Sequence, residues 1–172
     1  MNTKKTITRS EFVKLSGLGI ASLPLLSFSP LNKPYKFVTK APLNVHLFSK
    51  HLQFLDYSEM CKMAAEMGFN GLDVTVRDKG HVLPENVARD LPKVVAEMKK
   101  HGLSTEMITT NVLDSKDPTS LEIIKTASNL GFKYYRMGWL DYPENASIPE
   151  SITTFKKLFS NLEELNKLYG IT

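Results

Sequence analysis

The chain has 172 residues, a formal net charge of +4 and a single cysteine, Cys61, so it cannot form an intrachain disulfide and packing must stabilise its fold. Residues 1–30 hold four basic side chains and one acid, which leaves 18 basic and 17 acidic residues in the rest. A nearly neutral body with four arginines in the whole chain argues against a broad surface that follows nucleic-acid phosphates.

Residues 1–30 have the pattern of an export signal. A basic head is followed by an almost uncharged run from Leu15 to Phe28 and by Ser29-Pro30. The run is too short and too rich in glycine and serine for a stable membrane span. The alternative is an amphipathic helix of the fold itself, which the pattern favours less.

The segment Thr8-Arg9-Ser10-Glu11-Phe12-Val13-Lys14 resembles the twin-arginine export motif, with Ser10 in place of the second arginine. The resemblance implies a periplasmic or otherwise exported protein, and the substitution leaves the general secretory route open. No cysteine follows the apolar run, which excludes a lipid-anchored cysteine. We expect no membrane span in the mature chain.

Residues 31–42 form a linker that contains proline and lysine, and αβ units are expected after it. Residues 43–48 are predicted to form a strand, and Asp56 is predicted to cap the helix that follows. A second strand is expected over 71–77. Asp90 is then predicted to cap a second helix, with Pro92 in its first turn.

Two more units follow in the same order. A strand over 103–110 precedes a helix opened by Asp117-Pro118, with Leu121, Ile124 and Ala127 on its apolar face. A strand over 132–137 precedes a long helix capped by Ser147. Its expected apolar stripe is Ile152, Phe155, Leu158, Phe159, Leu162 and Leu165.

Glycine separates each helix from the next strand, at Gly68, Gly102, Gly131 and Gly170. Glycine ends helices because it adopts the left-handed conformation without a Cβ penalty. Ile171-Thr172 then reads as the start of a fifth strand. We therefore expect the chain to be the N-terminal half of a larger fold.

Repeated βα units form either an open doubly wound sheet or a (βα)₈ barrel. The expected second strand alternates Leu72, Val74 and Val76 with polar residues, whereas strands covered on both faces are continuously apolar. One polar face favours a barrel, which needs roughly 250 residues. The predicted fold class is α/β, a partial (βα)₈ TIM barrel of about four units over residues 43–172.

In such barrels the site lies at the carboxyl ends of the strands. Candidate residues there include three of the four histidines, His46, His51 and His81. The substrate-binding candidates are Lys50, His51, Arg77, His81, Glu106, Arg136 and Trp139. Arg77 could hold an oxygen and His81 could move a proton, or both could belong to a solvated turn. Trp139 could stack on a sugar ring or act as a packing lid.

Asp73, Glu106 and Arg136 are expected to point into the barrel lumen from adjacent strands. Charges brought together away from water must pair, so a structural ion network is preferred over a role in substrate binding. Glu106 has the stronger functional case, because we expect it to lie nearer the mouth of the barrel. No phosphate-binding glycine loop, Gly-x-Ser-x-Gly elbow or metal-ligand spacing occurs.

Residues 43–172 resemble the sugar phosphate isomerases and epimerases of the xylose-isomerase-like barrel superfamily. Four segments carry the resemblance: Val45 to His51, Ala64 to Arg77, Gly80 to Glu85, and Tyr134 to Trp139. It implies metal-assisted proton transfer next to a carbonyl, with one divalent metal (Mn, Mg, Co or Zn) held by residues of strands five to eight. This chain would then supply only groups that bind a small carbohydrate. We expect the 172-residue chain itself to show no isomerase activity.

Two other functions remain open. One is a non-catalytic exported module that binds sugar or assembles as a homo-oligomer, with two half-barrels closing each other's edges. The other is a nuclease similar to endonuclease IV, which the neutral body disfavours. Nucleic acid is therefore not an expected partner.

Overall fold

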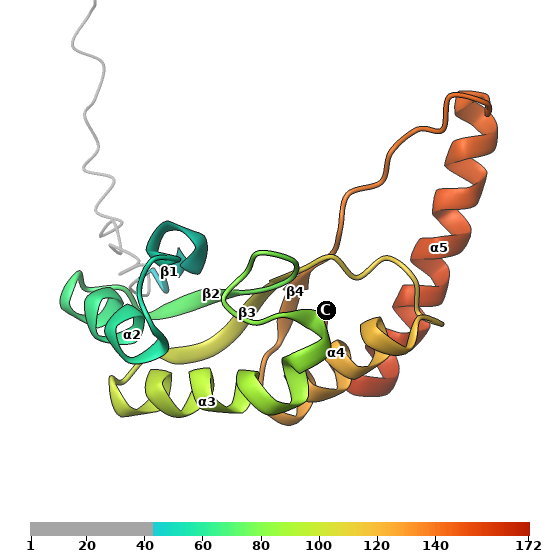
Figure 1. The fold of residues 1–172 in the computed structure, drawn as a ribbon. Coiled ribbons are helices and arrows are strands. Elements are labelled where there is room, and N and C mark those ends of the chain that lie inside the picture. The colour runs from blue at the N-terminus through green and yellow to red at the C-terminus, as the bar shows by residue number, and fades with distance from the viewer. Residues whose placement is uncertain (1–42) are drawn as a thin grey trace, which may run out of the picture. The chain divides into compact units, whose positions relative to one another are not determined.

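The computed structural model describes residues 43–172, which form a parallel sheet with a helix after each strand (Figure 1). The export signal and linker predicted for residues 1–42 lie outside the described residues. The strands are β1 (His46–Phe48), β2 (Gly71–Val76), β3 (Ser104–Thr110) and β4 (Tyr134–Arg136). The helices are α2 (Tyr57–Glu66), α3 (Val87–Lys100), α4 (Pro118–Asn129) and α5 (Ile148–Tyr169), with short 3₁₀ turns at Ser49–Leu52 (η1) and Pro84–Asn86 (η2).

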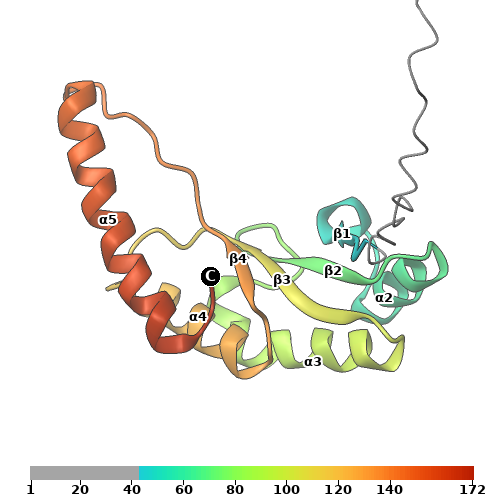
Figure 2. The same cartoon turned by 180° about the vertical axis from the view of Figure 1, so that it is seen from behind.

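The strand order in space is the order in the chain, β1-β2-β3-β4, and every neighbouring pair is parallel. Right-handed crossovers that always step in one direction place their helices on one face of the sheet. Figures 1 and 2 show α2, α3 and α4 on that face. An open doubly wound sheet would reverse direction at a switch point. The prediction of a partial (βα) barrel is confirmed.

The core lies between the sheet and these helices. Leu72, Val74 and Val76 of β2 are completely buried, as are Met60 of α2 and Leu91 of α3. The alternation predicted for β2 is therefore correct for its helix-facing side. Asp73, on the other side of the strand, is only partly covered. The polar face of the sheet is the one that the helices leave free.

Glycine ends the helices as predicted. Gly170 follows α5 with φ +62° and donates its N–H to the carbonyl of Asn166. Gly68, Gly102 and Gly131 also have positive φ, between +72° and +91°. Left-handed backbone of this kind turns the chain from the helix into the next strand.

The last residue, Thr172, bonds the backbone beside β4. The Thr172 N–H donates to the carbonyl of Lys133 at 2.8 Å, and its own carbonyl accepts from the N–H of Tyr135 at 2.8 Å. Thr172 thus bonds the two residues on either side of Tyr134, which is the hydrogen-bond pattern of parallel strands. Ile171 is buried in the core. The predicted first step of a fifth strand is therefore present.

The predicted start of α3 is wrong. The helix begins at Val87, and Asp90 and Pro92 lie inside it. Val87 is buried as fully as Leu91, so apolar burial extends the helix one turn earlier than the expected cap. Asp90 instead bonds Arg89 and Lys93.

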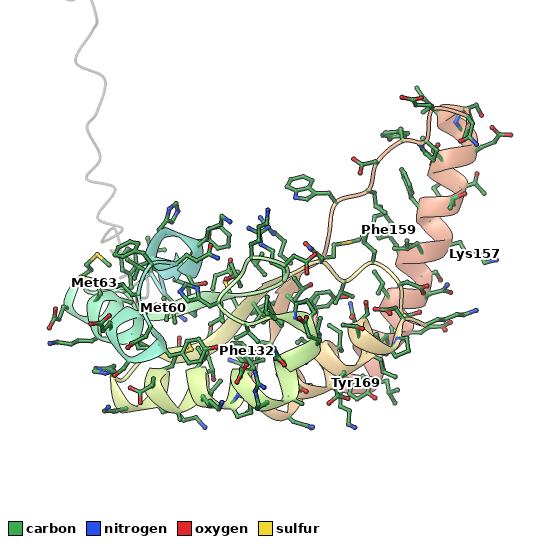
Figure 3. All side chains as sticks on the ribbon, viewed as in Figure 1. Met60, Met63, Phe132, Lys157, Phe159 and Tyr169 are labelled. Carbon is green, nitrogen blue, oxygen red and sulfur yellow. The ribbon has the colours of Figure 1, made fainter. Side chains whose placement is uncertain are left out.

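The capping box predicted for α5 is present, with Ser147 and Glu150 bonding each other's backbone N–H. Its predicted stripe is buried only in the second half of the helix. Leu162 is 3% exposed, whereas Phe159 is 47% exposed. The first half of α5 projects beyond the sheet, and Phe159 lies near the middle of the helix (Figures 1 and 3). None of the helices in residues 43–172 is both long and apolar enough to cross a membrane.

Candidate functional site

Three strands bring an aromatic ring and two guanidinium groups together at their carboxyl ends. Phe48 is the last residue of β1, Arg77 directly follows β2, and Arg136 ends β4. The guanidinium carbon of Arg77 lies 5.8 Å from the centre of the Phe48 ring, and that of Arg136 lies 5.6 Å from it. Guanidinium groups at this distance are attracted by the π electrons of the ring.

Trp139 adds a second aromatic surface to this group. The guanidinium carbon of Arg136 lies 5.9 Å from the centre of the Trp139 ring. The indole is 77% exposed, so most of it is free to contact a ligand. The preceding Gly138 passes close to β3, where an added Cβ would come within 3.0 Å of the Asn111 carbonyl. We call Phe48, Arg77, Arg136 and Trp139 the carboxyl-end cluster.

His51 and Lys50 lie on the 3₁₀ turn η1 that follows β1. The His51 ring meets Phe48 edge to face, with 5.8 Å between the ring centres. Lys50 is exposed. The structure thus brings His51, Arg77, Arg136 and Trp139 of the predicted site residues together around one ring. Whether they bind a substrate stays a prediction.

Asp73 lies deeper on the same face of the sheet. Both of its carboxylate oxygens accept from the Thr109 hydroxyl at 2.9 Å. Burial raises the pKa of Asp73, and the Thr109 hydrogen bond and the positive charges of Arg136, His46 and Arg77 oppose that rise. A carboxyl group in this place can accept from, or when protonated donate to, a ligand hydroxyl.

His81 is held by protein atoms on both ring nitrogens. Nε2 lies 3.3 Å from the Leu52 carbonyl, and Nδ1 lies 3.5 Å from the Thr75 hydroxyl. Burial lowers the pKa of His81, and the bond to Leu52 opposes the shift. These contacts tie the loop after β2 to η1, and the predicted role of His81 at the substrate is not tested by them.

Glu106 does not lie nearer the mouth, so that prediction is wrong. Met107 pairs with Asp73 in the β2–β3 register, which places Glu106 before Asp73 and closer to the amino ends of the strands. It accepts from Asn44 at 3.0 Å and lies 3.5 Å from the Lys133 ammonium. An irregularity in the register between Gly71 and Asp73 shifts β3 and displaces this side chain.

His46 also lies at the amino end, not at the carboxyl end where we expected it. It is the first residue of β1, and its ring covers Gly71. Its Nε2 is 3.2 Å from the Ser104 hydroxyl and 3.8 Å from Glu106. The ion network expected for Asp73, Glu106 and Arg136 is therefore wrong for the described residues. Glu106 lies near His46 and Lys133, and Asp73 bonds Thr109 without an ion pair to Arg136.

Phe48 is the residue that the sequence analysis missed. Its apolar side chain gave no signal of chemistry, although its place at the end of a predicted strand, before Ser49-Lys50-His51, put it at the mouth. Barrel strands alternate between core and lumen, and that alternation could have identified it.

Metal-binding residues do not gather in the described part of the chain. No group of three or more histidine, cysteine, aspartate or glutamate side chains within residues 43–172 is placed to hold a metal ion. The side chains of the described residues therefore do not fit the divalent metal that the resemblance implies.

The sheet order and the polar mouth define the class of fold, α/β with the consecutive parallel strands of a partial (βα) barrel. Among solved structures, the chain is similar to a crystal structure of D-psicose 3-epimerase in the presence of D-fructose, with a TM-score of 0.52 and 11% sequence identity. The match covers 76% of this chain and 50% of the epimerase chain. The chain thus matches half the length of that structure. Identity this low shows a shared fold alone.

The sequence comparisons found no counterpart. No family model matches the chain, and no curated protein sequence matches it.

Proposed function

We propose that residues 43–172 supply the substrate-binding part of an exported sugar isomerase or epimerase barrel. The carboxyl-end cluster is the observation that carries this proposal, because it gathers polar and aromatic groups from β1, β2 and β4 where barrels place their sites. The structural likeness to an epimerase barrel supports the same class. Export rests on the leader pattern of residues 1–30.

Trp139 offers the surface on which a sugar ring stacks. Pyranose and furanose rings have apolar C–H faces, and an exposed indole provides a rigid apolar plane for one of them. The Phe48 ring is engaged by the two guanidinium groups, so it positions them. Their N–H groups then donate to sugar oxygens, and Asp73 bonds a hydroxyl deeper in the lumen.

The reaction proposed for the whole barrel is proton transfer at the carbon beside a carbonyl. The described residues bind and orient the sugar in this scheme. The groups that remove and return the proton, and the ligands of any divalent metal, are assigned to barrel strands beyond the four described here. The match covers only half of the epimerase chain, which supports the proposal that a complete barrel has further strands.

Trp139 is the only tryptophan, so its fluorescence reports on the proposed site directly. We expect D-psicose or D-fructose at millimolar concentration to change this fluorescence saturably in the 172-residue chain. Ligand-detected NMR on Trp139→Ala should show binding weakened at least fivefold, and Trp139→Phe should retain most of the affinity because it keeps an aromatic face.

Lys133→Gln is the matched control, because Lys133 is an exposed cation at the opposite end of β4. It should bind sugar as the parent chain does. The absence of saturable binding for either sugar, or equal affinity in Trp139→Ala, would contradict the proposal.

A further inference from the structure

The arginines differ in whether a carboxylate neutralises them. Arg89 forms a two-pronged bond to Asp90, at 2.9 Å and 2.7 Å. In contrast, the guanidinium groups of Arg77 and Arg136 make no ion pair and no hydrogen bond with any protein group in residues 43–172. Both instead lie against Phe48.

This arrangement leaves the hydrogen-bonding edges of both guanidinium groups free. A ring attracts a guanidinium without using its N–H donors, which form a planar fork that matches the oxygens of a carboxylate or phosphate. The ring quadrupole does not cancel the positive charge. Two like charges held at one ring repel each other, and a bound anion would relieve that repulsion.

Burial raises the pKa of the Asp73 carboxyl and the charges of both arginines oppose that rise, but the carboxylate does not neutralise the arginines. Its two oxygens already accept from Thr109, and it lies more than 4.0 Å from either guanidinium, since no ion pair joins them within the described residues. Charge is therefore left over at the mouth. Arg77 is also half-buried, so its charge is less screened than that of a surface side chain.

We propose that Arg77 and Arg136 together bind the oxyanion of a negatively charged sugar, one that carries a carboxylate or a phosphate group. The inference rests on the proposed sugar site and names the class of substrate for it. Trp139, in contact with Arg136, would stack on the ring of the same ligand while the two guanidinium groups hold its anionic end. Phe48 acts as a positioning residue that seats both arginines.

The test compares four probes on the 172-residue chain at low ionic strength. They are D-fructose, D-fructose 6-phosphate, D-glucuronate and inorganic phosphate, followed by Trp139 fluorescence and by ligand-detected NMR. We expect at least one charged sugar to bind tenfold or more tighter than D-fructose, and this preference to shrink with added salt. The phosphate and carboxylate arms distinguish the two sources of the oxyanion.

Three variants and one control connect that preference to the geometry. Arg77→Gln and Arg136→Gln should each lower the affinity for the charged sugar about tenfold, as expected for one charge-assisted hydrogen-bonding group. They should lower the affinity for D-fructose by a smaller factor, because glutamine keeps an N–H donor for a neutral sugar oxygen and loses only the charge. Phe48→Leu keeps both arginines but removes the aromatic ring that positions them, so it should also reduce the preference for the charged sugar. Lys133→Gln removes a positive charge at the other end of the strands and should leave the preference unchanged.

The possible outcomes distinguish failure of the anion-binding inference from failure of the proposed sugar-binding function. Equal affinity for D-fructose and both charged sugars, or a preference that survives in both arginine variants, overturns the inference and leaves the sugar site standing. Binding of inorganic phosphate that the arginine variants lose, without binding of any sugar, supports the anion site and contradicts the sugar function. No binding of any probe overturns both.

Discussion

His81 shows at the residue scale how burial gives a side chain a pH-dependent effect on stability. Its pKa is lowered in the folded protein because burial disfavours the charged ring. In the unfolded chain the ring titrates near its ordinary value of about 6.5. Between the two pKa values the unfolded state binds more protons, so falling pH favours unfolding.

We predict that the free energy of unfolding falls as pH drops below about 6.5 and that His81→Gln removes part of this fall. The contribution is fully present above pH 6.5 and is lost as pH drops toward the lowered folded pKa. Urea unfolding at several pH values measures it. His51→Gln is the control, because His51 is exposed. A parent-minus-variant difference that stays constant with pH would contradict the account of His81.

Helix caps at the element scale have different consequences according to what the helix packs against. Asp117 caps α4 by accepting from the N–H of Ser120 at 2.7 Å, and Ser120 is buried. Ser147 caps α5 at the end that projects beyond the sheet, where Ile148 is 64% exposed. The first cap therefore belongs to the cooperative core, and the second holds a segment with little packing of its own.

We predict that Asp117→Ala lowers the global free energy of unfolding by about 1 kcal/mol, the usual effect of removing a cap. Ser147→Ala should change the global value by less, because the first turns of α5 can fray without opening the core. Amide hydrogen exchange should then rise at residues 150–155 and stay unchanged in α4. Equal global losses in the two variants would show that α5 is cooperative along its whole length.

The sequence predicted those elements whose limits are set by local chemistry. Caps at Asp56, Asp117 and Ser147 and the glycine stops are properties of a few neighbouring residues, and all are present. The start of α3 was wrong because burial of Val87 overrode the local signal of Asp90 and Pro92. The exposed half of α5 could not be foreseen either, since an apolar stripe does not say what covers it.

The sequence placed several candidate site residues at the correct end of the sheet, but it did not show their contacts. Arg77, Arg136, His51 and Trp139 were identified because they end predicted strands or follow them. Glu106 and His46 were misplaced because the register irregularity of β3 and the late start of β1 are set by pairing between strands. Such pairing depends on residues far apart in the sequence, which local patterns do not report.

At the scale of residues 43–172 as a whole, we infer that the two ends of the sheet have different roles: one stabilises the fold and the other binds a ligand. At the amino ends Glu106 accepts from Asn44 and lies within 4.0 Å of Lys133 and His46, as groups that stabilise a fold do. At the carboxyl ends, the guanidinium N–H groups of Arg77 and Arg136 make no hydrogen bond within the described residues, and most of the Trp139 side chain is exposed. A ligand should therefore meet one end only.

An NMR titration of the isotopically labelled chain with D-fructose and D-fructose 6-phosphate tests this claim most directly. The account predicts saturable shifts in the backbone amides of Arg77, Arg136 and Trp139 and in the Trp139 indole N–H, with Glu106 and Lys133 unmoved. Shifts centred on Glu106 and Lys133, or no saturable shift at the carboxyl ends with either ligand, would contradict it.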